Sequence, residues 1–237
     1  MSSASTSGEA TPAVVHDDDM VAIAHLPGTS GVGIVSFSGP DPEYGGLTPQ
    51  EIRNCLPDTQ HDIWFVTDKT RHWYNETYDA ILFLLQIEMT RRNITRVVTL
   101  GNSMGGFGAI LFAKHIVNCT RAVAFAPQSA IAPQIVGWET RWRDVIADVK
   151  EWRSLDAAKE LDPWISYYII VGAAAPRDVK HASRFKSSDV TVHRVEDARH
   201  NVAKFLQQKG SLAPLINDLV NSETVDFPAL RERWNLS

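Results

Sequence analysis

The sequence predicts an α/β fold, in which helices flank a mostly parallel central sheet. Short apolar segments of strand length alternate along the chain with segments whose apolar residues recur at helical spacing, as in right-handed βαβ units. Apolar runs such as Tyr-Tyr-Ile-Ile-Val at 167–171 show no polar alternation, which is typical of strands covered on both faces. The sequence has no visible internal repeat, so a single folded unit is expected.

The predicted strands begin near the N-terminus. Residues 20–26 alternate loosely and are expected to form a hairpin with residues 32–37 across the turn between them. The parallel strands expected after this hairpin are 61–66, 96–100, 121–126, 166–171 and 191–195.

Helices are predicted between these strands. Thr48 and Glu51 have the spacing of a capping box, so a short helix is expected to begin at Thr48. A longer amphipathic helix is expected over 76–92, with Asn75 as its N-cap, because its apolar residues recur at helical spacing. The remaining predicted helices are 104–117 and 202–222, the second broken near Gly210.

Composition and charge exclude several classes of protein. With 44% hydrophobic and 22% charged residues, the 237-residue chain is typical of a globular protein, and one domain is expected over 16–237. The net charge of -5 and the lack of a clustered basic face argue against nucleic-acid binding. No apolar run approaches the roughly 18 residues of a membrane span.

The N-terminal residues and the cysteines bear on the cellular setting. Residues 1–15 are rich in Ser, Ala and Thr and lack the charged and apolar regions of a signal peptide, so a disordered leader is expected there. Two cysteines are too few for a disulfide framework, which favours a reducing, cytoplasmic setting.

One segment is too long for a simple crossover between strands. Residues 134–165 are rich in tryptophan, and Trp142, Val145, Ile146 and Val149 have the spacing of an amphipathic helix. We interpret the segment either as a crossover helix that packs on the core or as a small helical lid over a pocket.

The most informative motif is Gly101-x-Ser103-x-Gly105, within Thr-Leu-Gly-Asn-Ser-Met-Gly-Gly at 99–106. An apolar strand precedes it and an apolar helix follows it, which is the context of a nucleophile elbow. The flanking glycines remove Cβ atoms that would collide with neighbouring elements, and the helix N-terminus directs free N–H groups toward the serine. The alternatives are a glycine-rich turn with an idle serine, and a phosphate loop, whose Gly-Lys-Ser/Thr signature is missing.

On these residues the sequence resembles the α/β-hydrolase superfamily, whose nucleophile elbow is similar to Leu-Gly-Asn-Ser-Met-Gly-Gly-Phe-Gly-Ala at 100–109. The order of elements over about 20–222 resembles it more loosely. The resemblance implies the α/β-hydrolase fold and a catalytic triad in the chain order Ser, Asp or Glu, His. Ser103 is then the nucleophile, the acid follows strand 166–171, and the histidine lies near the C-terminus.

Two residues fit the remaining triad positions. His200 follows the last predicted strand and is the expected general base. Asp178 is the only carboxylate of the segment 172–178 and is the expected acid, although it would also serve as a helix N-cap. The rival acids are Asp197, which shares a loop with His200, and Asp189.

The resemblance also implies an oxyanion hole made by two backbone N–H groups. Met104, directly after the nucleophile, is expected to supply one, and the loop after 32–37 the other. That loop has the sequence Ser38-Gly39-Pro40 where the family usually has His-Gly-x. Because Pro40 has no N–H to donate, Gly39 or Ser38 is the expected second donor.

The expected reaction is cleavage of a small-molecule carboxylic ester or thioester through an acyl-enzyme, and no cofactor or metal is implied. The expected substrate-binding residues are Trp73, Trp138 and Trp142, and the arginines near them, which would suit an anionic end of the substrate, are Arg71, Arg141 and Arg143. Packing and solvation are the alternative roles for these side chains.

Two further functions remain open at this point. One is an acyltransferase or thioesterase that uses the same triad on carrier-bound acyl groups. The other is a binding module on the same fold whose catalytic site has lapsed.

Overall fold

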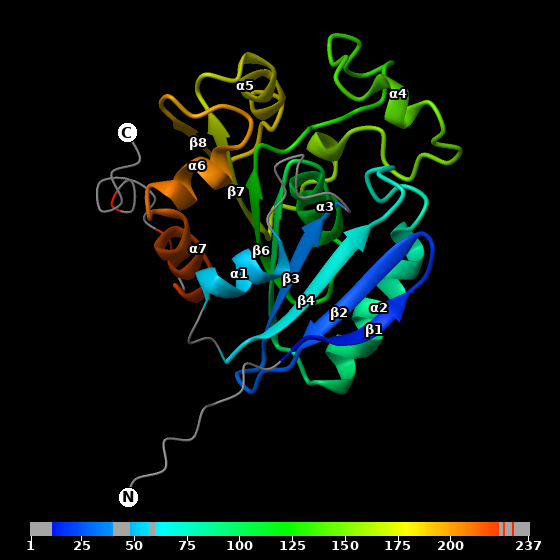
Figure 1. Cartoon of the computed structure of the whole chain (residues 1–237), viewed down its shortest axis with the longest axis vertical. Helices are drawn as coiled ribbons and strands as arrows, with labels where there is room; N and C mark the ends of the chain where they lie inside the picture. Colours follow the sequence, from blue (N-terminus) through cyan, green and yellow to red (C-terminus); the bar gives the residue numbers. More distant parts are fainter. Residues whose placement is uncertain (1–10, 40–47, 57–59, 223–224, 226–228, 230–237) are drawn as a thin grey trace, which may run out of the picture.

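One sheet organises the molecule (Figure 1). The computed structural model describes residues 11–39, 48–56, 60–222, 225 and 229, and within them eight strands form the sheet. The strands are β1 (Ala13–Asp17), β2 (Val21–Leu26), β3 (Val32–Ser38), β4 (Asp62–Asp68), β5 (Arg96–Asn102), β6 (Cys119–Phe125), β7 (Ser166–Gly172) and β8 (Val190–Val195). Their order in the sheet is β1-β2-β4-β3-β5-β6-β7-β8. Every neighbouring pair from β4 to β8 is parallel, whereas β1 and β2 are antiparallel additions beside β4.

Two expectations about the N-terminal strands are wrong. The predicted hairpin does not form, because β2 pairs with β4, and β3 lies between β4 and β5, parallel to both. Ile34 and Val35 of β3 are buried on opposite faces, as in a strand of the sheet interior. Strand β1 begins at Ala13, so the last residues of the expected leader belong to the sheet, and residues 1–10 lie outside the described residues.

The other predicted strands are confirmed, with boundaries that differ by two residues at most. The parallel register matters for function, because the carboxyl ends of β3 to β8 meet at one edge of the sheet. The loops and helix N-termini that follow these strands therefore meet at the same edge, where ligands bind in open α/β sheets.

Helices cover both faces of this sheet (Figure 1). The helices are α1 (Pro49–Cys55), α2 (Tyr78–Arg91), α3 (Met104–Ala113), α4 (Arg143–Ile146), α5 (Pro176–Ala182), α6 (Val202–Gln208) and α7 (Leu212–Asn221), with a 3-10 turn, η2 (Ala157–Lys159). Helices α1, α6 and α7 bury their apolar residues in one core cluster, and α2, α3, α4 and α5 in the cluster on the other face. In the described part of the chain, no helix is long and apolar enough to cross a membrane.

Local capping explains where some helices begin and end. The predicted capping box is confirmed, since the Thr48 hydroxyl accepts from Glu51 N and the Glu51 carboxylate accepts from Thr48 N. The predicted break near Gly210 is also confirmed, because Gly210 has a φ of 71° between α6 and α7. Asn75 is not the N-cap of α2: its side chain is buried and instead contacts His72 O and Ser154 N.

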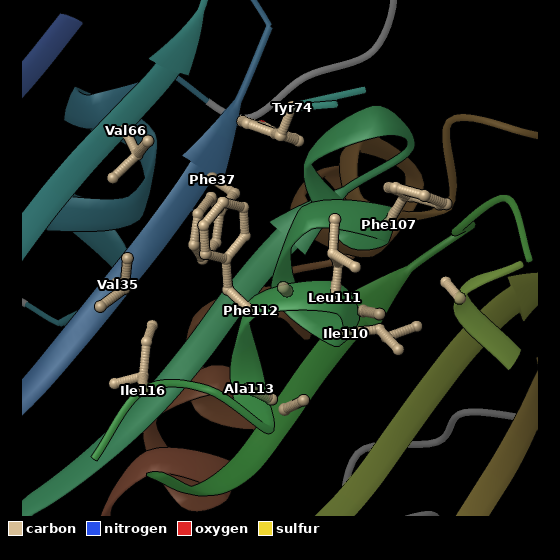
Figure 2. Packing of buried hydrophobic residues seen from close by; sticks show 14 of the residues in the cluster. Val35, Phe37, Val66, Tyr74, Phe107, Ile110, Leu111, Phe112, Ala113 and Ile116 are labelled. Carbon is tan, nitrogen blue, oxygen red and sulfur yellow. The ribbon is translucent and has the colours of Figure 1, made fainter. Parts of the chain in front are cut away.

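Helix α3 begins directly after Ser103 of the serine motif. All ten of its residues are buried, and it ends at Ala113, earlier than predicted. Figure 2 shows Phe112 of α3 against Phe37 of β3, with the two rings 4.8 Å apart between centroids. The Tyr78 ring stacks on Phe112 from α2 at 4.6 Å. Aromatic packing on both sides fixes α3 against the sheet.

The long segment 134–165 contains only short helical turns. The amphipathic helix expected near 142–149 is reduced to the single turn α4. Its apolar residues nevertheless pack on the same core cluster as α2 and α3: Ile146 is buried, and Trp142, Val145 and Val149 are partly buried against it. The spacing therefore identified the face that packs on the core but overestimated the helix length. A role as a lid stays a prediction.

Candidate active site

The serine motif forms a strained turn between β5 and α3. Ser103 has φ 55° and ψ -117°, a conformation that L-residues rarely adopt. Its N–H donates to Phe125 O at the end of β6, at 2.7 Å. A Cβ atom at position 101 would lie 2.1 Å from Gly105 O, and one at position 105 would lie 2.0 Å from Phe37 O. Both glycines are therefore required by close approach of backbone to backbone.

The structure brings Ser103, His200 and Asp178 together in one chain of hydrogen bonds. Ser103 Oγ lies 2.9 Å from His200 Nε2, and His200 Nδ1 lies 2.7 Å from Asp178 Oδ2. An ionised carboxylate only accepts hydrogen bonds, so Nδ1 carries a proton, and in the neutral imidazole Nε2 then accepts from the Ser103 hydroxyl. This is the arrangement in which an imidazole can remove the serine proton. The catalytic roles of the three residues stay predictions.

The segments that carry the acid and the base are tied to each other. Asp178 lies in the first turn of α5 and is fully buried, whereas His200 lies in the loop between β8 and α6. Ala174 N, on the way to α5, donates to Ala198 O in the His200 loop at 3.0 Å. A Cβ atom at Gly172 would lie 2.3 Å from that same carbonyl. The glycine at the end of β7 thus allows the two segments to approach closely.

The rival acids have other surroundings. Asp197 is exposed, with a φ of 59°, on the loop that carries His200. Asp189 accepts from the hydroxyls of Ser187 and Ser188. Of the three candidates, only Asp178 is described in contact with an imidazole nitrogen of His200.

The expected oxyanion donors lie on two neighbouring segments. Met104 is the first residue of α3, so its N–H has no partner within the helix. A Cβ atom at Gly39 would lie 2.9 Å from Met104 Cε, which places Gly39 beside the elbow. The carbonyl of Ser38 accepts from Tyr74 Oη at 2.8 Å, so the N–H of the same trans peptide, that of Gly39, points away from Tyr74. Pro40 lies outside the described residues.

A second polar side chain reaches the serine. Gln128, fully buried just after β6, lies with Nε2 3.3 Å from Ser103 Oγ, while its Oε1 accepts from Trp73 Nε1 at 3.0 Å. Because an indole N–H only donates, it fixes the orientation of the amide and turns the NH₂ group toward Ser103. Trp73 lies on a turn with positive φ at 71, 73 and 74, which the buried Asp68 stabilises by accepting from Tyr74 N and Thr70 N.

The three expected substrate-binding tryptophans occupy different places. The Trp142 ring lies 6.4 Å from the His200 ring and 5.5 Å from the Trp73 ring, so Trp73 and Trp142 form an aromatic wall near the serine and the imidazole. Trp138 packs on the His181 ring, with 4.5 Å between the ring centroids, and the Lys180 ammonium lies over the Trp138 ring, 4.3 Å from its centroid. A role in substrate binding stays a prediction for all three.

Arg141 is engaged by carboxylates of the protein itself. Its Nη2 donates to Asp178 Oδ1 at 2.9 Å and to Glu139 Oε2 at 2.7 Å. Burial would lower the pKa of Arg141, but the hydrogen bonds to Glu139 and the charge of Asp178 outweigh it and raise the pKa. An arginine shared by two carboxylates is poorly placed to bind the anionic end of a substrate, which was one possible role for it. Arg143 donates to Gly137 O at 3.0 Å.

Both carboxylates next to Arg141 are held in the charged form. Burial would raise the pKa of Asp178, but the hydrogen bond from His200 and the charges of His200 and Arg141 outweigh it and lower the pKa. The pKa of Glu139 is lowered in the same way, because hydrogen bonds from His181 and Arg141 outweigh its burial. The site therefore presents ionised Asp178 to His200.

Sequence reasoning missed Gln128 and Glu139. Gln128 follows a parallel strand, so its position at the carboxyl edge of the sheet was the available signal. Glu139 had no such signal, because it lies in the irregular segment 134–165. Among the described residues, no group of three or more His, Cys, Asp or Glu side chains is arranged to hold a metal ion.

The comparisons with known proteins agree with this fold. No protein-family model and no curated protein sequence matches the chain. Solved structures do match, although at low sequence identity. Est1E from Butyrivibrio proteoclasticus is 11% identical, with a TM-score of 0.62 over 90% of this chain and 100% of the other. The 2,6-dihydroxy-pseudo-oxynicotine hydrolase is 14% identical, with a TM-score of 0.59 over 90% and 68%.

A third match is the Pyrococcus horikoshii acylaminoacyl peptidase, 13% identical, with a TM-score of 0.63 over 94% of this chain and 43% of the peptidase. The strand order, the elbow and these matches together show that the chain has the α/β-hydrolase fold. The expected fold class is confirmed.

Proposed function

We propose that this chain is a serine hydrolase that cleaves a carboxylic ester or thioester through an acyl-enzyme. The observation that carries the proposal is the hydrogen-bonded chain Ser103–His200–Asp178, with links of 2.9 and 2.7 Å, at the carboxyl edge of the sheet. Est1E, the hydrolase and the peptidase named above share the fold, which supports the reaction class by analogy only.

In the proposed mechanism, His200 Nε2 takes the Ser103 proton as Oγ attacks the carbonyl carbon of the substrate. The negative charge that develops on the carbonyl oxygen is stabilised by the N–H groups of Met104 and Gly39. His200 then gives the proton to the leaving alkoxide or thiolate, and the C–O or C–S bond breaks. Water then attacks the acyl carbon while His200 takes its proton, and His200 gives this proton to Ser103 Oγ as the C–Oγ bond breaks and the carboxylic acid leaves.

The geometry favours an active hydrolase over a lapsed binding module. A module without catalysis has no reason to hold Ser103 in a strained conformation, with its hydroxyl hydrogen-bonded to an imidazole and the imidazole hydrogen-bonded to a buried carboxylate. Gln128 adds a donor to the same hydroxyl oxygen, which leaves its hydrogen directed to His200.

The experiment is a panel of p-nitrophenyl esters of increasing acyl length, assayed with the wild type and with Ser103→Ala. We expect Ser103→Ala to lower kcat by about 10³-fold or more without loss of stability, because it removes the nucleophile but little packing. Ser183→Ala is the matched control, since Ser183 is exposed and its hydroxyl donates to Lys180 O within α5.

Covalent labelling gives a second readout that needs no substrate. A fluorophosphonate probe should label the wild type and Ser183→Ala but not Ser103→Ala. Normal ester turnover by folded Ser103→Ala would refute the proposal. Absence of both turnover and labelling in the wild type would favour the binding module.

A further inference from the structure

Asp178 is held through both of its carboxylate oxygens. Oδ2 lies 2.7 Å from His200 Nδ1, and Oδ1 accepts from Arg141 Nη2 at 2.9 Å. A carboxylate bound in this way cannot rotate about its terminal bond without breaking a charge-assisted hydrogen bond. Arg141 therefore fixes which oxygen of Asp178 faces the imidazole.

Arg141 is itself held by a second carboxylate, that of Glu139. The Glu139 carboxylate accepts from Arg141 Nε, with both oxygens at 3.1 Å, from Nη2 at 2.7 Å and from the backbone N–H at 2.9 Å. Glu139 is buried, so its charge is compensated by the protein rather than by bulk water. Because both oxygens of the Glu139 carboxylate bind the guanidinium group, the Arg141 side chain is held in a single orientation.

A buried histidine fixes Glu139 in turn. His181 Nε2 lies 3.1 Å from Glu139 Oε2, and His181 Nδ1 accepts from Ser129 N at 3.1 Å. A backbone N–H can only donate, so Nδ1 carries no proton, and Nε2 donates its proton to Glu139. Both His181 and Ser129 are fully buried. This second Ser–His–acid arrangement is closed to substrates and can act only through Glu139.

We infer that Arg141 is a positioning residue, which orients the Asp178 carboxylate toward His200 and is kept in place by Glu139 and His181. The inference rests on the proposed function for the roles of Asp178 and His200. The inference also makes residues 139–141 part of the fixed structure of the active centre. Any lid movement of the segment 134–165 is then confined to its other residues.

The charge of Arg141 gives the inference a measurable consequence. Its Nη1 lies 3.5 Å from His200 Nδ1, and both atoms carry hydrogen, so this contact is repulsive once the imidazole is protonated. The described groups that face His200 are Ser103, Asp178, Arg141 and the Trp142 ring, with Glu139 behind Arg141. Without the guanidinium, two carboxylates would act on the imidazole with no balancing cation.

The experiment follows the titration of the His200 ring by NMR and measures kcat/KM for an ester. Arg141→Met should raise the His200 titration midpoint by about one pH unit or more and lower kcat/KM by about 10- to 100-fold. Arg141→Lys keeps the positive charge but loses the planar guanidinium that binds both carboxylates. The His200 midpoint should therefore stay near the wild-type value, whereas kcat/KM should still fall.

Arg177→Met is the matched control. Arg177 precedes Asp178 in α5 and also reaches the segment 134–165, but its Nη2 donates to the neutral hydroxyl of Thr140, and the side chain is exposed. Its loss should leave the midpoint and kcat/KM unchanged, because solvent screens an exposed charge. An equal midpoint shift in Arg177→Met and Arg141→Met would overturn the specific role of Arg141.

Two other outcomes also bear on the inference. A wild-type midpoint in Arg141→Met would overturn it, even with lower kcat/KM, because a merely structural loss does not move the titration. If Arg141→Met does not fold, Glu139→Gln replaces it: removing one negative charge should lower the midpoint, and an unchanged midpoint overturns the inference. The NMR midpoint needs no substrate, so it can be read even if the wild type cleaves no ester, which would refute the proposed function instead.

Discussion

At the scale of the residue, the choice of the acid depends on burial and direction. Asp178 is fully buried and reaches His200 Nδ1 from a separate element, opposite the side on which Ser103 contacts Nε2. Asp197 is exposed on the loop of His200 itself, with a left-handed backbone that Asp and Asn both tolerate.

We expect Asp178→Asn to lower kcat by about 10³- to 10⁴-fold, because an amide no longer fixes the imidazole tautomer that accepts the Ser103 proton. Asp197→Asn should change kcat by less than about threefold and leave stability intact, since Asn also adopts positive φ. Steady-state kinetics and thermal melts on both variants test this. If Asp197→Asn loses activity while Asp178→Asn stays active, the acid lies on the loop that carries His200.

The residues that meet at the site were predictable where a local pattern indicated them. Ser103 lies in a motif whose chemistry depends on its immediate neighbours, and His200 and Asp178 could be selected by their order after predicted strands. Gln128, Glu139 and the role of His181 were not accessible in this way. Their contacts join residues from 25 to 55 positions apart in irregular segments. No sequence periodicity predicts that such residues will be in contact.

At the scale of the element, the elbow depends on how closely α3 approaches β3. A Cβ atom at Gly105 would lie 2.0 Å from Phe37 O and 3.3 Å from Ser38 N, both backbone atoms at the end of β3. Backbone cannot yield as a flexible side chain can, so any side chain at 105 must push α3 off the sheet, together with Ser103 and the Met104 N–H.

Gly105→Ala should therefore destabilise the fold by about 2 to 4 kcal/mol and reduce ester turnover further than stability alone explains. Gly210→Ala is the control: Gly210 has a φ of 71° but no atom within 4 Å of an added Cβ, so only the left-handed backbone is penalised, at about 1 kcal/mol. Urea unfolding of both variants measures the difference. Equal losses would mean that α3 can shift away from β3 without penalty.

Helices and strands were well predicted where the sequence pattern was regular. They were poorly predicted where tertiary contacts determined the strand pairing or the helix cap. The alternation and capping signals placed the parallel strands β4 to β8 and the helix α1 correctly. The hairpin of 20–26 with 32–37 was wrong because the apolar run of β3 has a lower free energy between two parallel neighbours. The Asn75 cap was wrong because the Asn75 side chain instead joins His72 O to Ser154 N, a contact that only the folded chain creates.

At the scale of the whole molecule, the parallel register gathers charge at one edge. β5, β6, β7 and β8 end beside Ser103, Gln128, α5 and the His200 loop respectively, so groups far apart in sequence form one network. Segment 134–165 adds Glu139 and Arg141 to it. Within this network the carboxylates of Asp178 and Glu139 have lowered pKa values, so folding and the ionisation of the site are linked.

The sign of this linkage predicts how stability depends on acid. A carboxylate whose pKa is lower in the folded chain than in the unfolded chain stabilises the fold above its unfolded pKa, about 4, and loses that contribution as pH falls toward the folded value. The free energy of unfolding of the wild type should therefore fall between pH 5 and pH 3. Glu139→Gln should be less stable at pH 7, because Arg141 and the buried His181 lose a charged partner, yet its loss of stability between pH 5 and pH 3 should be smaller by about 1 to 2 kcal/mol. Glu88→Gln, which removes an exposed ion pair with Arg91 on α2, should follow the wild-type curve. Urea unfolding at both pH values measures these differences. If Glu139→Gln loses as much free energy of unfolding between pH 5 and pH 3 as the wild type does, then the fold does not hold Glu139 in its charged form.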